Sequence, residues 1–174
     1  MNDQKTEKPL IAQAAEDLFN YAIEREDVKL LVEQLSPASR LKPSAFEYEL
    51  QILKIISVGW GLAYCLEGTP GRKAVLGELF WRAVNDFSKE LSETTGLMIG
   101  QDIDYFQILK SRLDQYVQAM QADPQAADPA VVVGPVFAGL CGNSDNIFAA
   151  MGGSKMFANA VARVRQYLEA LKLR

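Results

Sequence analysis

Residues 44–68 read SAFEYELQILKIISVGWGLAYCLEG, and after Lys54 this segment carries no charge until Glu67. At its start, Ser44 and Glu47 have the spacing of a capping box, in which each side chain bonds to a free backbone N–H of the first turn. The glycine that closes the segment is a common residue after a helix end. A helix that is apolar on every side is buried. The segment therefore predicts a helix over residues 46–67 at the centre of the fold.

Two glycines, Gly59 and Gly61, interrupt this apolar helix. Each lowers helix propensity by roughly 1 kcal/mol relative to alanine, so the close approach of a neighbouring backbone is the expected benefit. Because helical bundles often hold ligands between facing helices, the alternative is an apolar ligand pocket. Its candidate residues are Gly59, Trp60, Gly61 and Tyr64.

Towards the N-terminus, the chain predicts two further helices. Apolar residues recur at helical spacing from Leu10 to Ile23, and Pro9 is expected to open this helix. A shorter apolar stripe over residues 28–35 stops at Ser36-Pro37, and the connector to Pro43 is expected to be a loop.

Towards the C-terminus, helix boundaries are marked by capping residues. Thr69-Pro70 predicts the start of a helix that ends before Gly96, and another helix begins near Asp102 or Asp104. Residues 122–128 form a linker rich in Ala, Asp, Pro and Gln, and Asp128-Pro129 marks the next start.

The fold of residues 129–153 is the hardest to predict. Three valines at 131–133 favour a strand locally, but no partner strand is evident, so a short, kinked helix to Cys141 is the interpretation. Asp145 is expected to cap the last helix, and Gly152-Gly153 to kink or split it. Together these patterns predict a single all-α domain over residues 1–174, an irregular bundle of six or seven helices around the apolar helix.

Composition excludes several classes of partner. The net charge of −4 argues against nucleic acid, which is bound by clustered Lys and Arg. The apolar runs 55–66 and 130–141 are too short to span a bilayer, and residues 1–9 lack the apolar core of a secretory signal. Cys65 and Cys141 lie in separate apolar segments and predict free thiols. These features predict a cytoplasmic protein without a membrane partner.

No recognisable catalytic constellation is present. The chain has no histidine, which removes the usual general base and argues against a metal site or a metal cofactor. Ser39-x-x-Lys42 and Ser144-Asp145-Asn146 imitate two motifs of a serine acyl-transfer enzyme, but the third motif, K-T-G, is missing. A histidine-free enzyme would need convergent polar side chains in a cleft, and none can be placed from sequence.

The leading functional hypothesis is therefore a protein that binds itself or another protein through helix faces. Trp81 is the interface candidate, because it lies about 120° from the centre of its helix's apolar stripe and tryptophan is enriched at interfaces. The competing interpretation is that its ring covers the edge of the core. The alternative function is a small-molecule-binding bundle with an apolar pocket beside the central helix.

Overall fold

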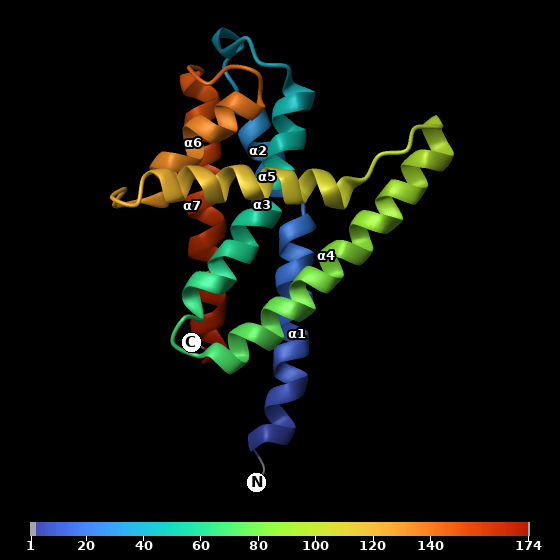
Figure 1. Cartoon of the computed structure of the whole chain (residues 1–174), viewed down its shortest axis with the longest axis vertical. Helices are drawn as coiled ribbons and strands as arrows, with labels where there is room; N and C mark the ends of the chain where they lie inside the picture. Colours follow the sequence, from blue (N-terminus) through green and yellow to red (C-terminus); the bar gives the residue numbers. More distant parts are fainter. Residues whose placement is uncertain (1–2, 174) are drawn as a thin grey trace.

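The computed structural model describes residues 3–173, with side chains described from Pro9 onward. Within this range the chain consists of helices and short connections, and none of these residues forms a strand (Figure 1). The prediction of an all-α fold is confirmed. The elements are α1 (Asp3–Ile23), α2 (Glu26–Glu33), the 3-10 turn η1 (Pro37–Ser39), α3 (Pro43–Cys65), α4 (Pro70–Ile99), α5 (Tyr105–Ala122), α6 (Pro129–Leu140) and α7 (Ile147–Ala170).

Helix α3 supplies much of the core. Its residues 52–59 are all buried, and α3 contacts each of the other α-helices. Burial of about 1.5–3 kcal/mol per large apolar side chain makes such a helix a major source of stability. The fully enclosed side chains include Leu50, Leu53 and Val58, and they are accompanied by the charged Lys54.

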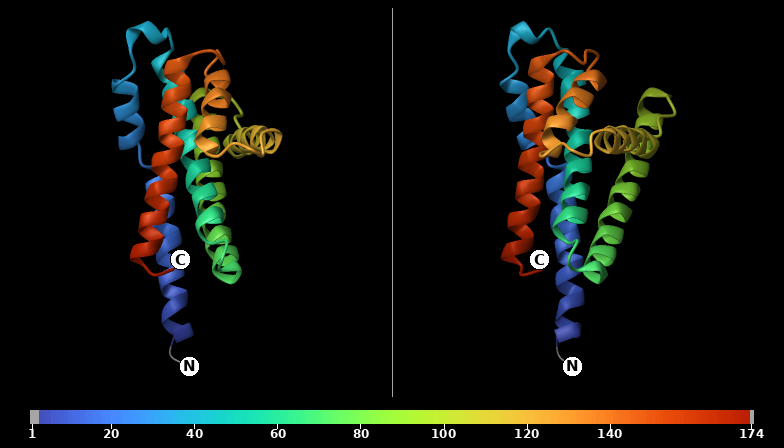
Figure 2. Two further views of the ribbon diagram at one scale, coloured as in Figure 1. Left: turned by 90° about the vertical axis from the view of Figure 1, so that its left-hand side faces the viewer. Right: turned by 60° about the vertical axis from the view of Figure 1, so that its left-hand side comes forward.

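The helices fall into a packed column and a divergent arm. In Figure 1, α1, α3 and α7 run along the long axis, whereas α4 leaves the lower end of α3 and leans away from it. Helix α5 then crosses back over the column towards α6. The two views of Figure 2 show the outer end of α4 standing clear of the other helices. Side chains of α3, α4 and α5, among them Ile52 and Ile55, line a cleft where α4 diverges.

Two predicted helix starts differ from the structure. Helix α1 begins at Asp3, so Pro9 lies inside it rather than at its first position. The capping box at Ser44 is not formed, because α3 begins at Pro43 and Lys42, not Ser44, occupies the N-cap position. The carboxylate of Glu47 instead forms an ion pair with Arg25, which comes from the connection between α1 and α2.

The end of α4 was also predicted too early. The helix continues through Gly96 to Ile99 and ends where Gly100 adopts a left-handed conformation, with φ of 67°. Glycine enters this region without the steric penalty of a side chain, which explains why the helix stops here. Asp104 then caps α5, since its Oδ1 accepts a 2.9 Å hydrogen bond from the Gln107 N–H.

Residues 129–153 are helical on both sides of a short turn. The valines at 131–133 lie in α6, whose first turn is capped by Asp128. Helix α7 passes through Gly152-Gly153 without a break, so the predicted split is wrong. Its N-cap is Asn146 rather than Asp145, because the Asn146 Oδ1 accepts from the Ala149 N–H at 3.1 Å. In the part of the chain that the structure describes, no helix is long and apolar enough to cross a membrane.

Candidate interaction groove

An apolar groove lies between α2, α6 and α7. Its volume is about 740 Å³. Val131 and Met151, on its two walls, are 68% and 66% exposed, and Phe148 at its end is 43% exposed. Exposed apolar side chains that lie together make this groove a candidate interaction surface. The lining residues are Leu31, Gln34, Leu35, Phe46, Ala130, Val131, Pro135, Phe148, Ala150, Met151, Gly152, Ser154, Lys155 and Ala158.

Glycines fix the walls of this groove. A Cβ at Gly134 would lie 2.7 Å from the Ala150 carbonyl oxygen, so α6 and α7 approach more closely than larger residues would allow. At Gly152 a Cβ would lie 2.7 Å from the Phe46 ring, which fills that space from α3. The Ser154 hydroxyl donates to the Ala130 carbonyl at 2.7 Å and joins the same two helices. The helices α6 and α7 are therefore closely packed beneath the groove.

Among the described residues, Lys155 is the only charged one that lines the groove. Its Nζ donates a 3.2 Å hydrogen bond to the Oε1 of Gln34, across from α7 to the end of α2. Charged side chains at the rim of an apolar surface fix the orientation of a partner more than they add affinity. The groove is thus apolar with one positive charge.

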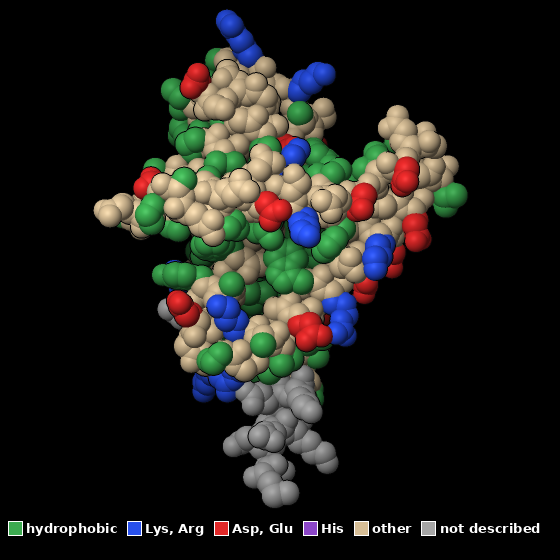
Figure 3. Space-filling view, in the orientation of Figure 1, with side chains coloured by type: hydrophobic (Ala, Val, Ile, Leu, Met, Phe, Trp, Pro, Cys, Tyr) green, Lys and Arg blue, Asp and Glu red, His purple; other side chains and the backbone are tan. Residues whose placement is uncertain are grey.

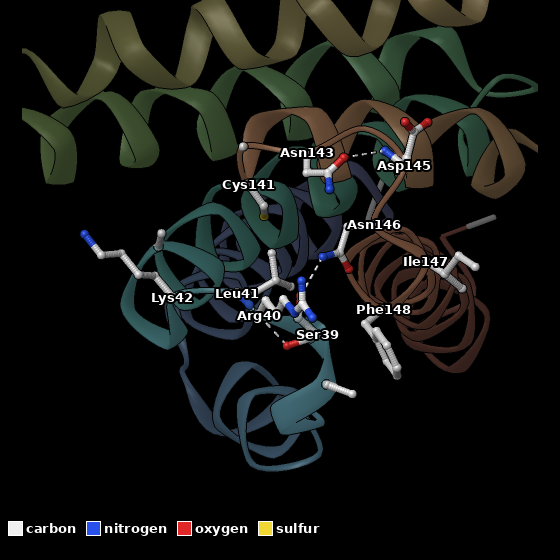
Figure 4. A pocket seen from close by; sticks show the side chains of 13 residues that line it. Ser39, Arg40, Leu41, Lys42, Cys141, Asn143, Asp145, Asn146, Ile147 and Phe148 are labelled. Carbon is white, nitrogen blue, oxygen red and sulfur yellow. Dashed lines mark hydrogen bonds between the residues drawn. The ribbon is translucent and has the colours of Figure 1, made fainter.

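Beyond Phe148 the groove meets a more polar hollow of about 620 Å³, drawn in Figure 4. The Asn146 Nδ2 donates to the Ser39 carbonyl at 2.8 Å and links η1 to the start of α7. The two sequence fragments that imitate a serine enzyme both contribute residues to this hollow. Arg40 and Lys42 supply positive charge here, and Asp145 a negative one.

These fragments do not form a catalytic site. Ser39 is only 4% exposed, and its Oγ accepts a 3.3 Å hydrogen bond from the Leu41 N–H. In Figure 4 the side chain of Lys42 extends away from Ser39, so no base lies beside the hydroxyl. A serine nucleophile needs a base within hydrogen-bond reach.

Cys141, which also lines the hollow, is not poised for nucleophilic chemistry. Burial raises the pKa of its thiol to about 12, and the nearby Glu49 carboxylate adds to the increase. Because the thiolate is the reactive form, a thiol with this pKa is largely inert at neutral pH. Both Cys141 and the buried Cys65 are free thiols.

Behind the hollow, a buried ion pair joins α5 to α3. The Arg112 Nε donates to the Glu49 Oε2 at 3.0 Å, and the Arg112 Nη2 donates to the Glu49 Oε1 at 2.8 Å. This paired geometry is the strongest form of such a contact. The Glu49 hydrogen bonds raise the pKa of Arg112, and burial followed by the Glu49 charge raises the pKa of Tyr116. Arg112 and Glu49 are thus each other's partners and have a structural role.

The four predicted pocket residues lie elsewhere. Side chains fill both glycine notches, since a Cβ at Gly59 would lie 2.3 Å from the Trp81 ring and one at Gly61 would lie 3.1 Å from Val164. Trp60 packs against Phe157, with 6.4 Å between ring centroids, and Tyr64 is 56% exposed. None of the four lines the groove or the hollow.

Trp81 is partly buried against the core. Its ring enters the Gly59 notch and meets Phe80 edge-on at 5.2 Å. This geometry favours the interpretation that the ring covers the edge of the core, and the interface role of Trp81 stays a prediction.

Sequence reasoning missed the groove itself. Ile147, Phe148 and Met151 lie within about 100° of one another around α7, a width that one buried stripe can hold, so helical periodicity alone predicts that they are buried. Among the described residues, no group of three His, Cys, Asp or Glu side chains could hold a metal ion.

The chain matches no known family model, and no curated protein or solved structure is significantly similar to it.

Proposed function

We propose that the protein is a binding protein that associates with a second copy of itself, with the groove of one copy receiving the end of α4 of the other. The observation that carries the proposal is that one chain has both an apolar groove and an exposed apolar helix end. Leu97, Met98 and Ile99 close α4 and are 89%, 79% and 57% exposed. Burying such side chains on association is favourable by about 25 cal/mol per Å² of apolar surface, before the costs of association.

The charges of the two surfaces are complementary. Residues 93–104 contain three carboxylates, those of Glu93, Asp102 and Asp104, and neither Lys nor Arg. Several acidic side chains lie along the outer part of α4 in Figure 3, and an apolar patch lies at its outer edge. The groove offers Lys155, and the adjoining hollow adds Arg40 and Lys42 against one carboxylate, that of Asp145. Complementary charge steers an apolar contact into one orientation.

The contact has to form between molecules. The end of α4 and the groove lie on opposite sides of the chain, as the views of Figures 1 and 2 agree. The end of α4 therefore cannot reach the groove of the same chain. Each copy would therefore donate one helix end and offer one groove, and such contacts form a closed assembly when the rotation between copies permits it.

Sedimentation velocity over a range of concentrations tests the proposal. The wild-type mass should rise above the 19.3 kDa of one chain, whereas Met98→Asp at the helix end and Met151→Asp in the groove should each weaken association by at least about tenfold. Both methionines are well exposed, so these variants should keep the fold. Val75→Asp, at an exposed position far from the end of α4, is the matched control and should associate like wild type.

Mixing the two variants gives a sharper test. The Met98→Asp protein keeps an intact groove and the Met151→Asp protein keeps an intact helix end, so the mixture should form a complex that neither variant forms alone. A wild-type protein that stays monomeric, or a mixture that stays dissociated, would contradict the proposal.

The proposed location is the cytoplasm. Its support is that both cysteines are free thiols, as expected in a reducing compartment. Fractionation of cells that express the protein tests the location.

A further inference from the structure

Two exposed methionines lie on the two surfaces of the proposed contact. Met98 is 79% exposed and belongs to the end of α4, which stands clear of the other helices in Figure 2. Met151 is 66% exposed and lines the groove. The other methionines that the structure describes are shielded, since Met156 is 1% exposed and Met120 is partly buried against the core. The two accessible thioethers of the described residues are therefore the two that the contact would cover.

The two cysteines compete poorly for an oxidant. Cysteine is oxidised through its thiolate and in proportion to its exposure. Cys65 is only 6% exposed, and burial raises the pKa of the Cys141 thiol to about 12, so little thiolate forms at neutral pH. A methionine thioether reacts as the neutral sulfur and needs no ionisation. A mild oxidant is therefore expected to reach Met98 and Met151 first.

Oxidation would make the contact polar. When a thioether reacts with hydrogen peroxide, the sulfur gains one oxygen atom and loses two electrons to become a sulfoxide, and the peroxide is reduced to water. The sulfoxide is polar, unlike the thioether. Leu97 and Ile99 flank the sulfur of Met98, and Val131 lies on the groove wall opposite Met151. A sulfoxide oxygen buried against these apolar side chains loses its hydrogen bonds to water, which opposes association.

We propose that Met98 and Met151 are oxidation sites through which hydrogen peroxide switches self-association off. The inference rests on the proposed function, since it concerns the contact between the helix end and the groove. A dissociated copy presents both sulfurs to solvent, so oxidation traps free copies and draws the assembly apart by mass action. A methionine sulfoxide reductase resets the switch, because it removes the oxygen as water while a dithiol is oxidised to a disulfide.

Peptide mapping by mass spectrometry after a brief exposure to hydrogen peroxide tests the modification itself. Met98 and Met151 should each gain one oxygen atom at least about tenfold faster than Met156, whose sulfur is enclosed. Their rates should fall as the protein concentration rises, because association covers both sulfurs. The rate at Met120, which does not line the groove, should stay constant. Equal oxidation of all four methionines would overturn the proposal.

Sedimentation velocity before and after peroxide treatment tests the switch. Oxidised wild-type protein should associate at least about tenfold more weakly, and treatment with methionine sulfoxide reductase should restore its association. The double variant Met98→Leu/Met151→Leu keeps both side chains apolar and of similar volume. It should associate like untreated wild type and stay associated after peroxide. Met120→Leu is the matched control and should respond to peroxide like wild type.

The outcomes separate this switch from the proposed function. If peroxide weakens the double leucine variant as much as wild type, the contact between helix end and groove stands, but Met98 and Met151 are not its switch. If peroxide leaves the association of wild type unchanged although both sulfurs are oxidised, the switch is again wrong. A wild-type protein that is monomeric before treatment would overturn both proposals.

Discussion

Towards α7, helix α3 packs through glycines at two points and through the Trp60–Phe157 pair, whereas towards α4 and α5 it is held by the Trp81 ring and an ion pair. Gly61 faces Val164 of α7, and Phe46 of α3 packs onto Gly152. On the other side, the Trp81 ring fills the notch at Gly59, and the Arg112–Glu49 pair holds α5.

This difference in packing explains where the helices separate and leave a cleft. Small residues let two helix backbones approach until side chains fill the space between them. Where a large ring and a long charged pair hold the helices instead, the helices can separate between those two attachments. The cleft at Ile52 and Ile55 lies in this region, and the same divergence carries the end of α4 out to solvent.

The largest expected effect comes from breaking the ion pair on the open side. Arg112→Leu leaves the Glu49 carboxylate, whose side chain is 7% exposed, without its partner. Loss of one partner from a buried pair costs about 3–5 kcal/mol, and we expect the lower end because the Arg112 side chain retains 24% exposure. Denaturant unfolding followed by circular dichroism measures the loss.

The matched control is Arg82→Leu on α4. Arg82 pairs with Glu78 one turn earlier, and both side chains are more than 60% exposed, so its loss should cost less than about 0.5 kcal/mol. If the two substitutions have equal cost, the buried pair does not hold α5 against α3 and the comparison fails.

The next effect tests the large ring. Trp81→Ala should lower the free energy of unfolding by about 3 kcal/mol, the lower end for large aromatic side chains, because the ring is only partly buried. Gly59→Ala should destabilise the wild type by about 1–3 kcal/mol, since its Cβ would meet the ring. In the Trp81→Ala background the same change should stabilise α3 by about 1 kcal/mol, through helix propensity alone.

A Gly59→Ala effect of the same sign in both backgrounds would show that the ring does not occupy the notch. Sedimentation of Trp81→Ala addresses the interface predicted from sequence at the same time. Lost association with unchanged stability would support that interface over the edge-of-core interpretation.

The sequence predicted helices well where their signals are local. Asp104 and Asp128 cap helices because an aspartate directly before a helix accepts a hydrogen bond from a backbone N–H of the first turn. Glycines were harder to interpret. Gly96 and Gly100 are equally able to end a helix, and Gly152-Gly153 reads as a break until Phe46 and Phe137 are seen to fill the space beside them.

The groove and the cleft could not be predicted, because each combines distant segments. The groove brings residues near 31–35, 131–135 and 148–158 together, and the cleft combines parts of five segments between Ile23 and Leu109. Helical periodicity states which face of one helix is buried but not which neighbour covers it. The exposure of Met98 and Met151 is likewise a property of the assembled helices.

The smallest expected effect concerns a polar pair on the closely packed side. The Tyr167 hydroxyl of α7 donates to Asp17 of α1, and this bond lowers the pKa of Asp17 from its usual value of 3.8. A carboxylate with a lowered folded-state pKa adds stability above the unfolded value, and this stability is lost as pH falls through the folded value. Tyr167→Phe should therefore cost up to about 1 kcal/mol near pH 7. The gap between its stability curve and that of wild type should close below about pH 4.

Tyr64→Phe, at an exposed tyrosine of α3, is the control and should leave the curve unchanged. Both proteins can be followed by thermal unfolding from neutral to acid pH. A stability difference between Tyr167→Phe and wild type that stays constant into acid would show that the Asp17 bond is not its source. A loss of stability as large as that of Arg112→Leu would mean that polar pairs stabilise the two sides of α3 equally.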